Sequence, residues 1–326
     1  MAAGGRPRAL FFGTPEFAVA SLERLLAPDS PVEVVGVVTQ PDKPVGRRQT
    51  LTPPPVKELA LARGVPVLQP ESLRPRAAVR ELARFTPDVG IVAAYGKILR
   101  PSVLALPAHG YLNVHASLLP RWRGAWPIGA ALMAGDTETG VTIMRLDEGL
   151  DTGPTLAVRP EPIRPDDTTE TLEPRLARLG ADLLVETLPA YLAGTLTPQT
   201  QDDAHATHCR AVEKADGLID WSKSAVEIER QVRAMRPWPI AWTTWHGQQL
   251  RVLRASVADG APGPAPGTVL AHGRGAAVVT GDGLLTLGAV QLQGKKAAPV
   301  AAFVNGYRGF VGSVLGGGAA GEQAIA

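Results

Sequence analysis

The amino-acid sequence predicts an α/β protein in which a doubly wound parallel sheet is followed by a smaller β-domain. Up to about residue 110, short β-branched runs alternate with amphipathic stretches, the pattern of a parallel sheet covered by helices on both faces. Beyond residue 209 the rhythm changes to short strands at about ten-residue spacing with turn residues between them. Such spacing is typical of a small β-barrel or sandwich.

The N-terminal part supplies the strands and helices of the sheet. Runs that read as strands lie at residues 9–12, 32–39, 65–68, 89–94, 112–115 and 141–144. Stretches with helical spacing lie at residues 18–26, 56–63, 77–85, 127–134 and 168–193. Thr168 or Thr169 suits the N-cap of the last helix, and Gly194 suits its end.

The C-terminal part begins after a polar stretch, residues 195–209, which reads as an interdomain linker. A helix is expected at residues 224–235, and strands at residues 241–245, 249–256, 267–271, 276–280 and 284–290. The small residues of 316–326 predict a disordered tail. The expected boundaries are therefore a first domain at 1–194, a linker at 195–209, a second domain at 210–315 and the tail.

Composition places the chain among ordinary globular proteins, since 45% of its 326 residues are hydrophobic and 20% are charged. Its single cysteine, Cys209, excludes an intrachain disulfide and fits a reducing compartment. His205 and His208 lie near this thiol, but one Cys with two His is a weak zinc pattern. No metal is expected.

Membrane and export signals are missing from the sequence, since no segment reaches the roughly 18 apolar residues of a membrane span and no signal-peptide cleavage pattern follows the N-terminus. We expect a cytoplasmic monomer without a membrane partner. The net charge of +2 is uneven, because residues 205–326 contain 12 Lys and Arg against 8 Asp and Glu. This excess is compatible with an anionic partner.

Polar side chains gather in the stretch from residue 111 to residue 154. Asn113 and His115 are two apart on an expected strand, so they share one face. Asp151 lies in a glycine-bracketed loop after the strand at 141–144. Because sites in open α/β sheets form where loops leave the carboxyl ends of strands, we expect both loops to meet at one crevice.

An amide, an imidazole and a carboxylate suit acyl transfer to an amine. Asn113 and an imidazolium at His115 can stabilise the oxyanion of a tetrahedral intermediate, and Asp151 can relay protons. An amine attacks directly, so the reaction needs no nucleophilic Ser or Cys. On local sequence alone, a buried polar pair explains Asn113 and His115 better than catalysis does, and a turn-forming role explains Asp151 best.

A longer comparison favours the first interpretation. The runs NVHASLLPRWRG (residues 113–124) and GLDTG (residues 149–153) resemble the signature of the formyltetrahydrofolate-dependent transferases. Within that family, RWRGAWPI (residues 121–128) and TQPDKPVGR (residues 39–47) are most similar to members that act on initiator methionyl-tRNA. The resemblance extends from Phe11 to residues 300–306, close to the whole chain.

The resemblance implies a Rossmann-like catalytic domain, a linker and an OB-fold-like domain that binds tRNA. It implies 10-formyltetrahydrofolate as co-substrate, and Asn113, His115 and Asp151 as catalytic residues. The folate site would be lined by Ser117, Leu118, Leu119 and Pro120, with backbone of residues 93–98 and 148–150. The implied activity is transfer of the formyl group to the amino group of methionine on the initiator tRNA.

A basic insertion at residues 41–52, PDKPVGRRQTLT, corresponds to the family's tRNA-binding loop. By this resemblance Lys43, Arg47 and Arg48 contact phosphates, and Arg47 reads the unpaired first base pair of the acceptor stem. Without the resemblance the stretch reads as a solvated surface loop. Lys295 and Lys296 are weaker phosphate candidates.

Three rival functions are weighed against this hypothesis. A formyltransferase for a small amine, such as a sugar nucleotide, would keep the three catalytic residues without needing the basic insertion. A nucleotide-dependent dehydrogenase is disfavoured because the first strand is followed by one glycine, Gly13, and not by a GxGxxG pattern. A non-catalytic RNA-binding protein would depend on its second domain alone.

Overall fold

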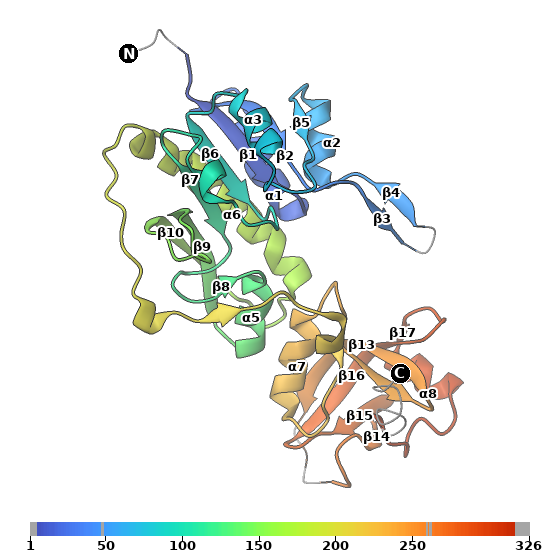
Figure 1. The fold of residues 1–326 in the computed structure, drawn as a ribbon. Coiled ribbons are helices and arrows are strands. Elements are labelled where there is room, and N and C mark those ends of the chain that lie inside the picture. The colour runs from blue at the N-terminus through green and yellow to red at the C-terminus, as the bar shows by residue number, and fades with distance from the viewer. Residues whose placement is uncertain (1–4, 47–48, 259, 261–262, 317–326) are drawn as a thin grey trace. The chain divides into compact units, whose positions relative to one another are not determined.

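The computed structural model describes residues 5–46, 49–258, 260 and 263–316 (Figure 1). The chain divides into two compact units. The first comprises Met1–Pro127, Thr137–Ile163 and Leu172–Arg210, and the second comprises Ile128–Asp136, Arg164–Thr171 and Ala211–Ala326. The tail expected at residues 316–326 lies outside the described residues from 317 onward.

A mixed sheet with the strand order β10-β9-β7-β6-β1-β2-β5 forms the centre of the first unit. Its strands are β1 (Arg8–Gly13), β2 (Glu33–Val38), β5 (Val67–Leu68), β6 (Val89–Ala93), β7 (Tyr111–His115), β9 (Glu138–Arg145) and β10 (Thr155–Pro162). The pairs from β7 through β6, β1 and β2 to β5 are parallel. The helices of this part of the chain are α1 (Glu16–Leu25), α2 (Pro55–Ala62), α3 (Arg76–Ala83), α4 (Pro101–Leu104), α5 (Pro127–Ala134) and α6 (Thr169–Leu192).

The central strands form because their sequences are mostly apolar, with the polar Asn113 and His115 in β7 as exceptions. Every residue of β6 and β7 is buried, as expected for strands covered on both faces. Phe12 of β1 packs edge-to-face against Tyr95 and Tyr111, with ring centroids 5.3 and 5.5 Å away. The Rossmann-like fold class predicted from the sequence is confirmed.

One edge of the sheet differs from the expected parallel arrangement. β9 runs antiparallel to β7, and β10 runs antiparallel to β9. Residues 146–154 join β9 to β10 without a helix. A parallel return needs a crossover of a dozen or more residues, so this connection dictates an antiparallel neighbour.

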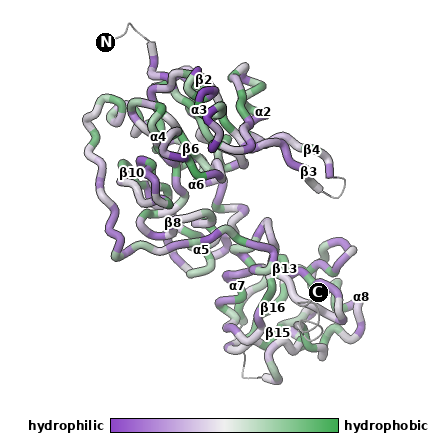
Figure 2. The backbone as a smooth tube through the Cα atoms, in the orientation of Figure 1, coloured by the Kyte–Doolittle hydropathy of each residue, from purple (hydrophilic) through white to green (hydrophobic). Residues whose placement is uncertain are grey.

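Two short strand pairs lie outside the main sheet. β3 (Lys43–Val45) and β4 (Thr50–Thr52) form an antiparallel hairpin that projects from the first unit (Figure 1). β8 (Arg123–Gly124) pairs in parallel with β11 (His208–Cys209), which follows the 3₁₀ turn η1 (Asp203–His205). The mostly hydrophilic stretch expected to be a linker (Figure 2) thus contributes a strand to the first unit.

The second unit contains an antiparallel sheet with the order β12-β13-β16-β15-β14, and β17 pairs with β16. Its strands are β12 (Trp242–Trp245), β13 (Gln248–Ala258), β14 (Val269–His272), β15 (Gly275–Val279), β16 (Leu284–Leu292) and β17 (Ala298–Pro299). Its remaining elements are η2 (Lys214–Gly217), α7 (Ala225–Ala234) and α8 (Val300–Gly306). This curled sheet agrees with the predicted OB-fold-like domain.

Capping and aromatic packing explain the local structure of the second unit. Ser224 and Glu227 form a reciprocal capping box at the start of α7, which stops the helix from fraying. Trp245 packs edge-to-face against Phe303 and Phe310, so a tryptophan of β12 fixes α8 and the segment after it. Among the helices that the structure describes, none combines the length and the apolar content needed to cross a membrane.

Candidate active site

Asn113 and His115 lie at the carboxyl-terminal half of β7, in the middle of the mixed sheet. Asn113 is paired in register with Val92 of β6, whose chain leaves the sheet one residue later. The two side chains share one face because they are two residues apart on a strand. The loop that follows β6 and the loop that follows β7 therefore start side by side.

Asp151 reaches this face by a route that the sequence argument did not foresee. The carboxyl end of β9 lies beside the amino end of β7, with Arg145 paired to Leu112, so the expectation of two adjacent carboxyl ends is wrong for β9. The loop 146–154 then turns back toward Met144, which lies opposite both Thr155 and Asn113. This return places Asp151 beside β7.

The three side chains converge around the carboxylate of Asp151. Asn113 Nδ2 lies 3.5 Å from Oδ1, and His115 Nδ1 lies 3.7 Å from Oδ2. Both distances exceed the 2.7–2.9 Å that is usual for charge-assisted hydrogen bonds, and catalytic contacts often tighten only when substrate binds. Two potential donors and one carboxylate thus point at a common centre.

Backbone groups hold two of these side chains in place. The amide of Gly124 donates to Asp151 Oδ2 at 2.8 Å. His115 Nε2 lies 2.9 Å from the carbonyl oxygen of Trp122, which can only accept, so Nε2 carries a proton. The imidazole is thereby fixed with Nδ1 toward Asp151.

The site is nearly buried but keeps access to solvent. Asn113 is 9% exposed and His115 is 5% exposed, and the Asp151 side chain is 12% exposed. Burial strengthens electrostatic interactions among these side chains, because the surrounding protein has a lower effective dielectric constant than water.

The four residues expected to line the folate site follow β7 directly. Ser117 is fully buried, and its hydroxyl donates to the carbonyl of Arg121 at 2.6 Å. The backbone of this stretch is tied to β9, since the amide of Leu119 donates to Thr142 Oγ1, which donates to the carbonyl of Ser117. Leu118 and Pro120 are half-buried. The segment therefore offers a rigid wall beside His115.

The two flanking backbone stretches have irregular conformations. After β6, Ala94 and Gly96 have φ values of 45° and 78°. The carbonyl of Tyr95 accepts hydrogen bonds from Thr14 Oγ1 and Gln40 Nε2, at 3.0 and 2.9 Å. Beside Asp151, the side chain of Leu150 is 59% exposed. An exposed apolar side chain beside irregular backbone suits a planar heterocycle, which needs packing surface and a few directed polar contacts.

Of the three residues predicted to contact tRNA, Lys43 lies on the hairpin. Lys43 is exposed at the start of β3, and its ammonium donates to Gln40 Oε1 at 2.7 Å. Arg47 and Arg48 lie outside the described residues. The base of the hairpin is anchored by Asp42, whose carboxylate accepts from Lys57 and Gln69 at 2.8 and 2.7 Å. In the second unit, Lys295 and Lys296 are exposed.

Sequence reasoning missed the residues that support the candidate site. Trp122 and Gly124 belong to the run at residues 113–124, but the sequence alone assigns no catalytic function to either. Gln201 and Thr207 stand in the polar stretch that reads as a linker. The Gln201 amide donates to the carbonyls of Asp151 and Gly153, at 2.8 and 2.7 Å. No local pattern in the sequence signals such a contact.

Cys209 is adjacent to the site but is not a suitable nucleophile. Its sulfur lies 3.4 Å from the carbonyl oxygen of Arg123. Burial, and to a smaller extent the negative charge of Asp151, raises the pKa of the Cys209 thiol, while a backbone hydrogen bond at Trp126 partly opposes this. A raised pKa keeps the thiol protonated and unreactive at neutral pH.

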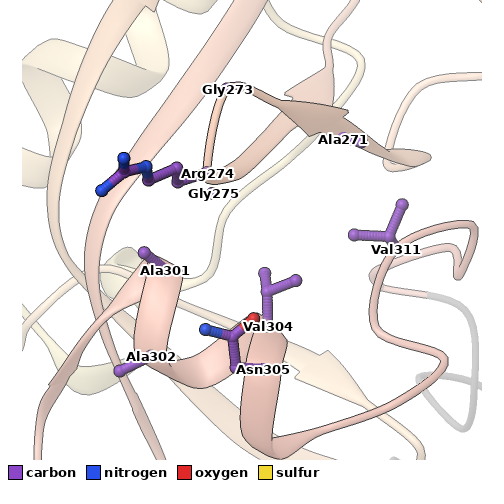
Figure 3. A pocket seen from close by; sticks show the side chains of 9 residues that line it. All are labelled: Ala271, Gly273, Arg274, Gly275, Ala301, Ala302, Val304, Asn305 and Val311. Atoms are coloured by element: carbon purple, nitrogen blue, oxygen red, sulfur yellow. The ribbon is translucent and has the colours of Figure 1, made fainter.

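A separate pocket lies in the second unit, between the β14–β15 turn and α8 (Figure 3). Its lining is mostly small or apolar, with one cation, Arg274, and one amide, Asn305. It contains no carboxylate or imidazole and none of the predicted site residues. Among the residues that the structure describes, no group of three or more His, Cys, Asp or Glu is placed to hold a metal ion.

An amide, an imidazole and a carboxylate around one point of an α/β sheet can stabilise an oxyanion and move protons, which is the chemistry needed by enzymes that transfer an acyl group to nitrogen. Residues 7–188 match the model of the family "Formyl transferase", and residues 211–308 match "Formyl transferase, C-terminal domain". The chain belongs to the formyl transferase family.

Relatives and solved structures agree with this assignment. The chain is 52% identical over 310 residues to methionyl-tRNA formyltransferase of Roseiflexus sp. (strain RS-1), covering 95% of each chain. It is 52% identical over 304 residues to methionyl-tRNA formyltransferase of Myxococcus xanthus (strain DK1622), covering 93% of this chain and 96% of the relative. The N-formyltransferase from Helicobacter canadensis, in complex with folinic acid and dTDP-3-aminofucose, matches with a TM-score of 0.64 at 17% identity, over 86% of this chain and 98% of that one. At that identity the likeness concerns the fold.

Proposed function

We propose that the protein transfers the formyl group of 10-formyltetrahydrofolate to the amino group of methionine on initiator methionyl-tRNA. The observation that carries this proposal is the convergence of Asn113, His115 and Asp151 within a chain that is 52% identical to a methionyl-tRNA formyltransferase over 95% of both lengths. Identity of that extent covers the catalytic unit and the second unit alike.

In the reaction, the amino nitrogen of methionine forms a bond to the formyl carbon, and the bond between that carbon and N10 of the folate breaks. The amine loses a proton and N10 gains one. We propose that Asn113 Nδ2 and, in the imidazolium form, His115 Nδ1 donate to the formyl oxygen while it carries negative charge. Asp151 lies between these donors and can accept the proton from the amine and return it to the leaving nitrogen.

The folate is proposed to lie against the wall formed by Ser117–Pro120 and the exposed Leu150. The irregular backbone at Ala94 and Gly96 supplies the directed contacts for its heterocycle. The stretch after β6 begins next to Asn113 in the sheet, and Leu150 directly precedes Asp151 in the chain. A folate held there would have its formyl group near the three proposed catalytic side chains.

The acceptor is proposed to be held by the basic hairpin together with the second unit. Lys43, Arg47 and Arg48 bring three positive charges to one short stretch of sequence, residues 41–52. Phosphate contacts from such side chains fix the register of a nucleic acid. The proposed setting of the reaction is the cytoplasm, with the protein acting as a monomer. The single, half-buried cysteine supports a reducing compartment.

A direct test incubates the protein with 10-formyltetrahydrofolate and methionylated initiator tRNA, followed by mass analysis of the aminoacyl end. A mass gain of one formyl group on the methionine is expected, with much less on methionylated elongator tRNA. A dTDP-linked amino sugar serves as the competing acceptor, because proteins of this fold include sugar N-formyltransferases. Formylation of the sugar with an unchanged tRNA would favour a formyltransferase that acts on a small amine. Binding of tRNA without any formyl transfer would favour a non-catalytic RNA-binding protein.

A further inference from the structure

Residues 199–209, here called the crossing segment, contact both the loop that carries Asp151 and the stretch 120–125 that follows β7. At one end Gln199 and Thr155 exchange two backbone hydrogen bonds of 2.8 Å each. At the other end the amides of Arg123 and Ala125 donate to the carbonyls of Thr207 and Cys209, at 2.8 and 3.1 Å. Figure 1 shows this segment passing β10 and reaching β8. It is fixed to the first unit at both ends.

Gln201 is the point at which the crossing segment holds the Asp151 loop. Its residue is 8% exposed, and both hydrogens of its amide are used, on the carbonyls of Asp151 and Gly153. Its Oε1 accepts from Arg123 Nε at 3.0 Å. Asp151 has a φ of 54°, a conformation that a non-glycine residue adopts rarely and keeps only when its surroundings enforce it.

Thr207 is the point at which the crossing segment holds the imidazole. Its hydroxyl accepts from the amide of Trp122 at 2.8 Å. Trp122 also has a positive φ, of 60°, and its carbonyl is the partner of His115 Nε2. If this carbonyl turned away, Nε2 would lose its acceptor and the ring could change tautomer or orientation.

A close approach of two backbones shows how tightly this arrangement is packed. Gly124 has a φ of 119°, and a Cβ atom built on it would lie 2.0 Å from the carbonyl oxygen of Cys209. Arg123 is buried and is neutralised by the crossing segment, since its guanidinium pairs with Asp203 at 2.7 Å. The segment cannot shift without moving β8, and β8 donates to Asp151.

We infer that Gln201 and Thr207 are positioning residues for the transfer reaction: Gln201 sets the carboxylate of Asp151, and Thr207, through Trp122, sets the ring of His115. The inference rests on the proposed function. It assigns a role in catalysis to a stretch whose sequence reads as a plain connection. A displacement of about 1 Å in such a site can lower the rate about 100-fold, so small changes at either residue should be measurable.

The experiment compares matched substitutions in the full-length protein. Gln201→Met keeps the length of the side chain and removes its hydrogen bonds. Thr207→Val keeps the shape and removes the hydroxyl, whereas Thr207→Ser keeps the hydroxyl. We expect kcat to fall about 10-fold to 100-fold for Gln201→Met and Thr207→Val, with KM for folate and for tRNA changed less than about threefold. Thr207→Ser should recover most of the rate.

His205→Ala serves as the control on the same segment, because the His205 side chain is 80% exposed and pairs with Asp202. It should behave as the unsubstituted protein. Melting temperatures of all variants separate loss of folded protein from loss of rate. If kcat per folded molecule stayed within about twofold for Gln201→Met and Thr207→Val, or if Thr207→Ser lost as much as Thr207→Val, the inference would be overturned.

A spectroscopic measurement tests the His115 arm without reference to turnover. Nitrogen-15 spectra of the imidazole should report a proton on Nε2 in the unsubstituted protein and in Thr207→Ser. Thr207→Val should show a mixture of tautomers. An unchanged Nε2–H signal in Thr207→Val would contradict the role of Thr207. Failure of the proposed function would appear differently, as an unsubstituted protein that forms no formylmethionyl-tRNA.

Discussion

At the scale of single residues, the site depends on a few backbone conformations that are costly in isolation. Asp151 and Trp122 both have positive φ values, of 54° and 60°. Each is held by a hydrogen bond with a residue far away in the chain: the Gln201 amide donates to the carbonyl of Asp151, and the amide of Trp122 donates to the Thr207 hydroxyl. The strain places a carboxylate and a carbonyl on either side of the His115 ring, which is an arrangement that regular strand or helix geometry would not produce.

Removal of the donors should stop the reaction and leave the protein folded. We predict that Asn113→Ala or His115→Ala lowers turnover by at least about 100-fold, because each removes one donor to the oxyanion. Affinity for tRNA should be largely retained. The measurement is single-turnover formylation with tRNA binding assayed in parallel, and the exposed His272 provides a control substitution to alanine. Turnover equal to that of the His272 control would remove the catalytic assignment.

Gly124, beside the site, should tolerate a side chain poorly. Gly124→Ala would combine a φ of 119° with a Cβ atom 2.0 Å from a backbone oxygen, so a loss of at least about 2 kcal/mol in the free energy of unfolding is expected. Gly64→Ala is the matched control, since Gly64 has a φ of 69° with open space around its Cβ position. It should cost about 1 kcal/mol. Chemical denaturation measures both, and equal losses would show that the contact with Cys209 is unimportant.

Individual residues of the site differed in how far the sequence revealed them. Asn113 and His115 could be placed on one strand face because alternation is a local property. Asp151 is expected beside them if the carboxyl ends of two parallel strands meet, and that reason fails because β9 is antiparallel to β7. Gln201 could not be found at all, because its partners Asp151 and Arg123 are 50 and 78 residues away. Hydrogen bonds over such separations leave no periodic trace in a sequence.

At the scale of elements, burial and length decided what could be predicted. The apolar runs of β1, β6 and β7 and the full length of α5 follow from local pattern. β8 and β11 have two residues each, which is too short for any periodicity. β10 contains Pro160 and Pro162, which argue against a central strand, and it is tolerated because it lies at the edge of the sheet.

An acidic contact between two helices of the first unit should make stability depend on pH. Burial, and to a lesser degree the charge of Glu16 on α1, raises the pKa of Glu173 on α6. A carboxyl with a raised pKa in the folded state destabilises the fold when it is ionised. That cost is fully present above the folded-state pKa and vanishes as the pH falls below the unfolded-state value.

We therefore predict that Glu173→Gln raises the melting temperature at pH 8 by a few degrees, and that the gain shrinks toward pH 4. The control is Glu23→Gln, an exposed glutamate of α1. Thermal denaturation across this pH range measures the effect. A gain that stayed the same at both ends of the range would show that ionisation of Glu173 is not its cause.

At the scale of the whole molecule, charge is concentrated where an RNA partner is proposed to bind. The chain carries a net charge of only +2, while residues 205–326 have 12 basic against 8 acidic residues. Lys43 lies on the hairpin of the first unit, and Arg47 and Arg48 add two more positive charges to the same stretch of sequence, residues 41–52. Because the positive charge is concentrated in two regions of a chain that is nearly neutral overall, a polyanion is expected to bind at those regions and not uniformly over the surface.

The salt dependence of tRNA binding should report the number of phosphate contacts that these cations make. Affinity is expected to fall linearly on a log–log scale as salt rises, with a slope proportional to the number of phosphates neutralised. Lys43→Ala should flatten that slope by about 1, and replacement of Lys43, Arg47 and Arg48 together by about 2 to 3, because each neutralised phosphate releases close to one counterion. The control for removal of a positive charge elsewhere is Arg80→Ala, since Arg80 is an exposed residue of α3 and α3 lies apart from the hairpin of β3 and β4 (Figure 1). Equal slopes for the hairpin variant and the Arg80 control would exclude phosphate contact at the hairpin. A lower affinity at every salt concentration with an unchanged slope would mean that the hairpin acts through its shape and not through its charge.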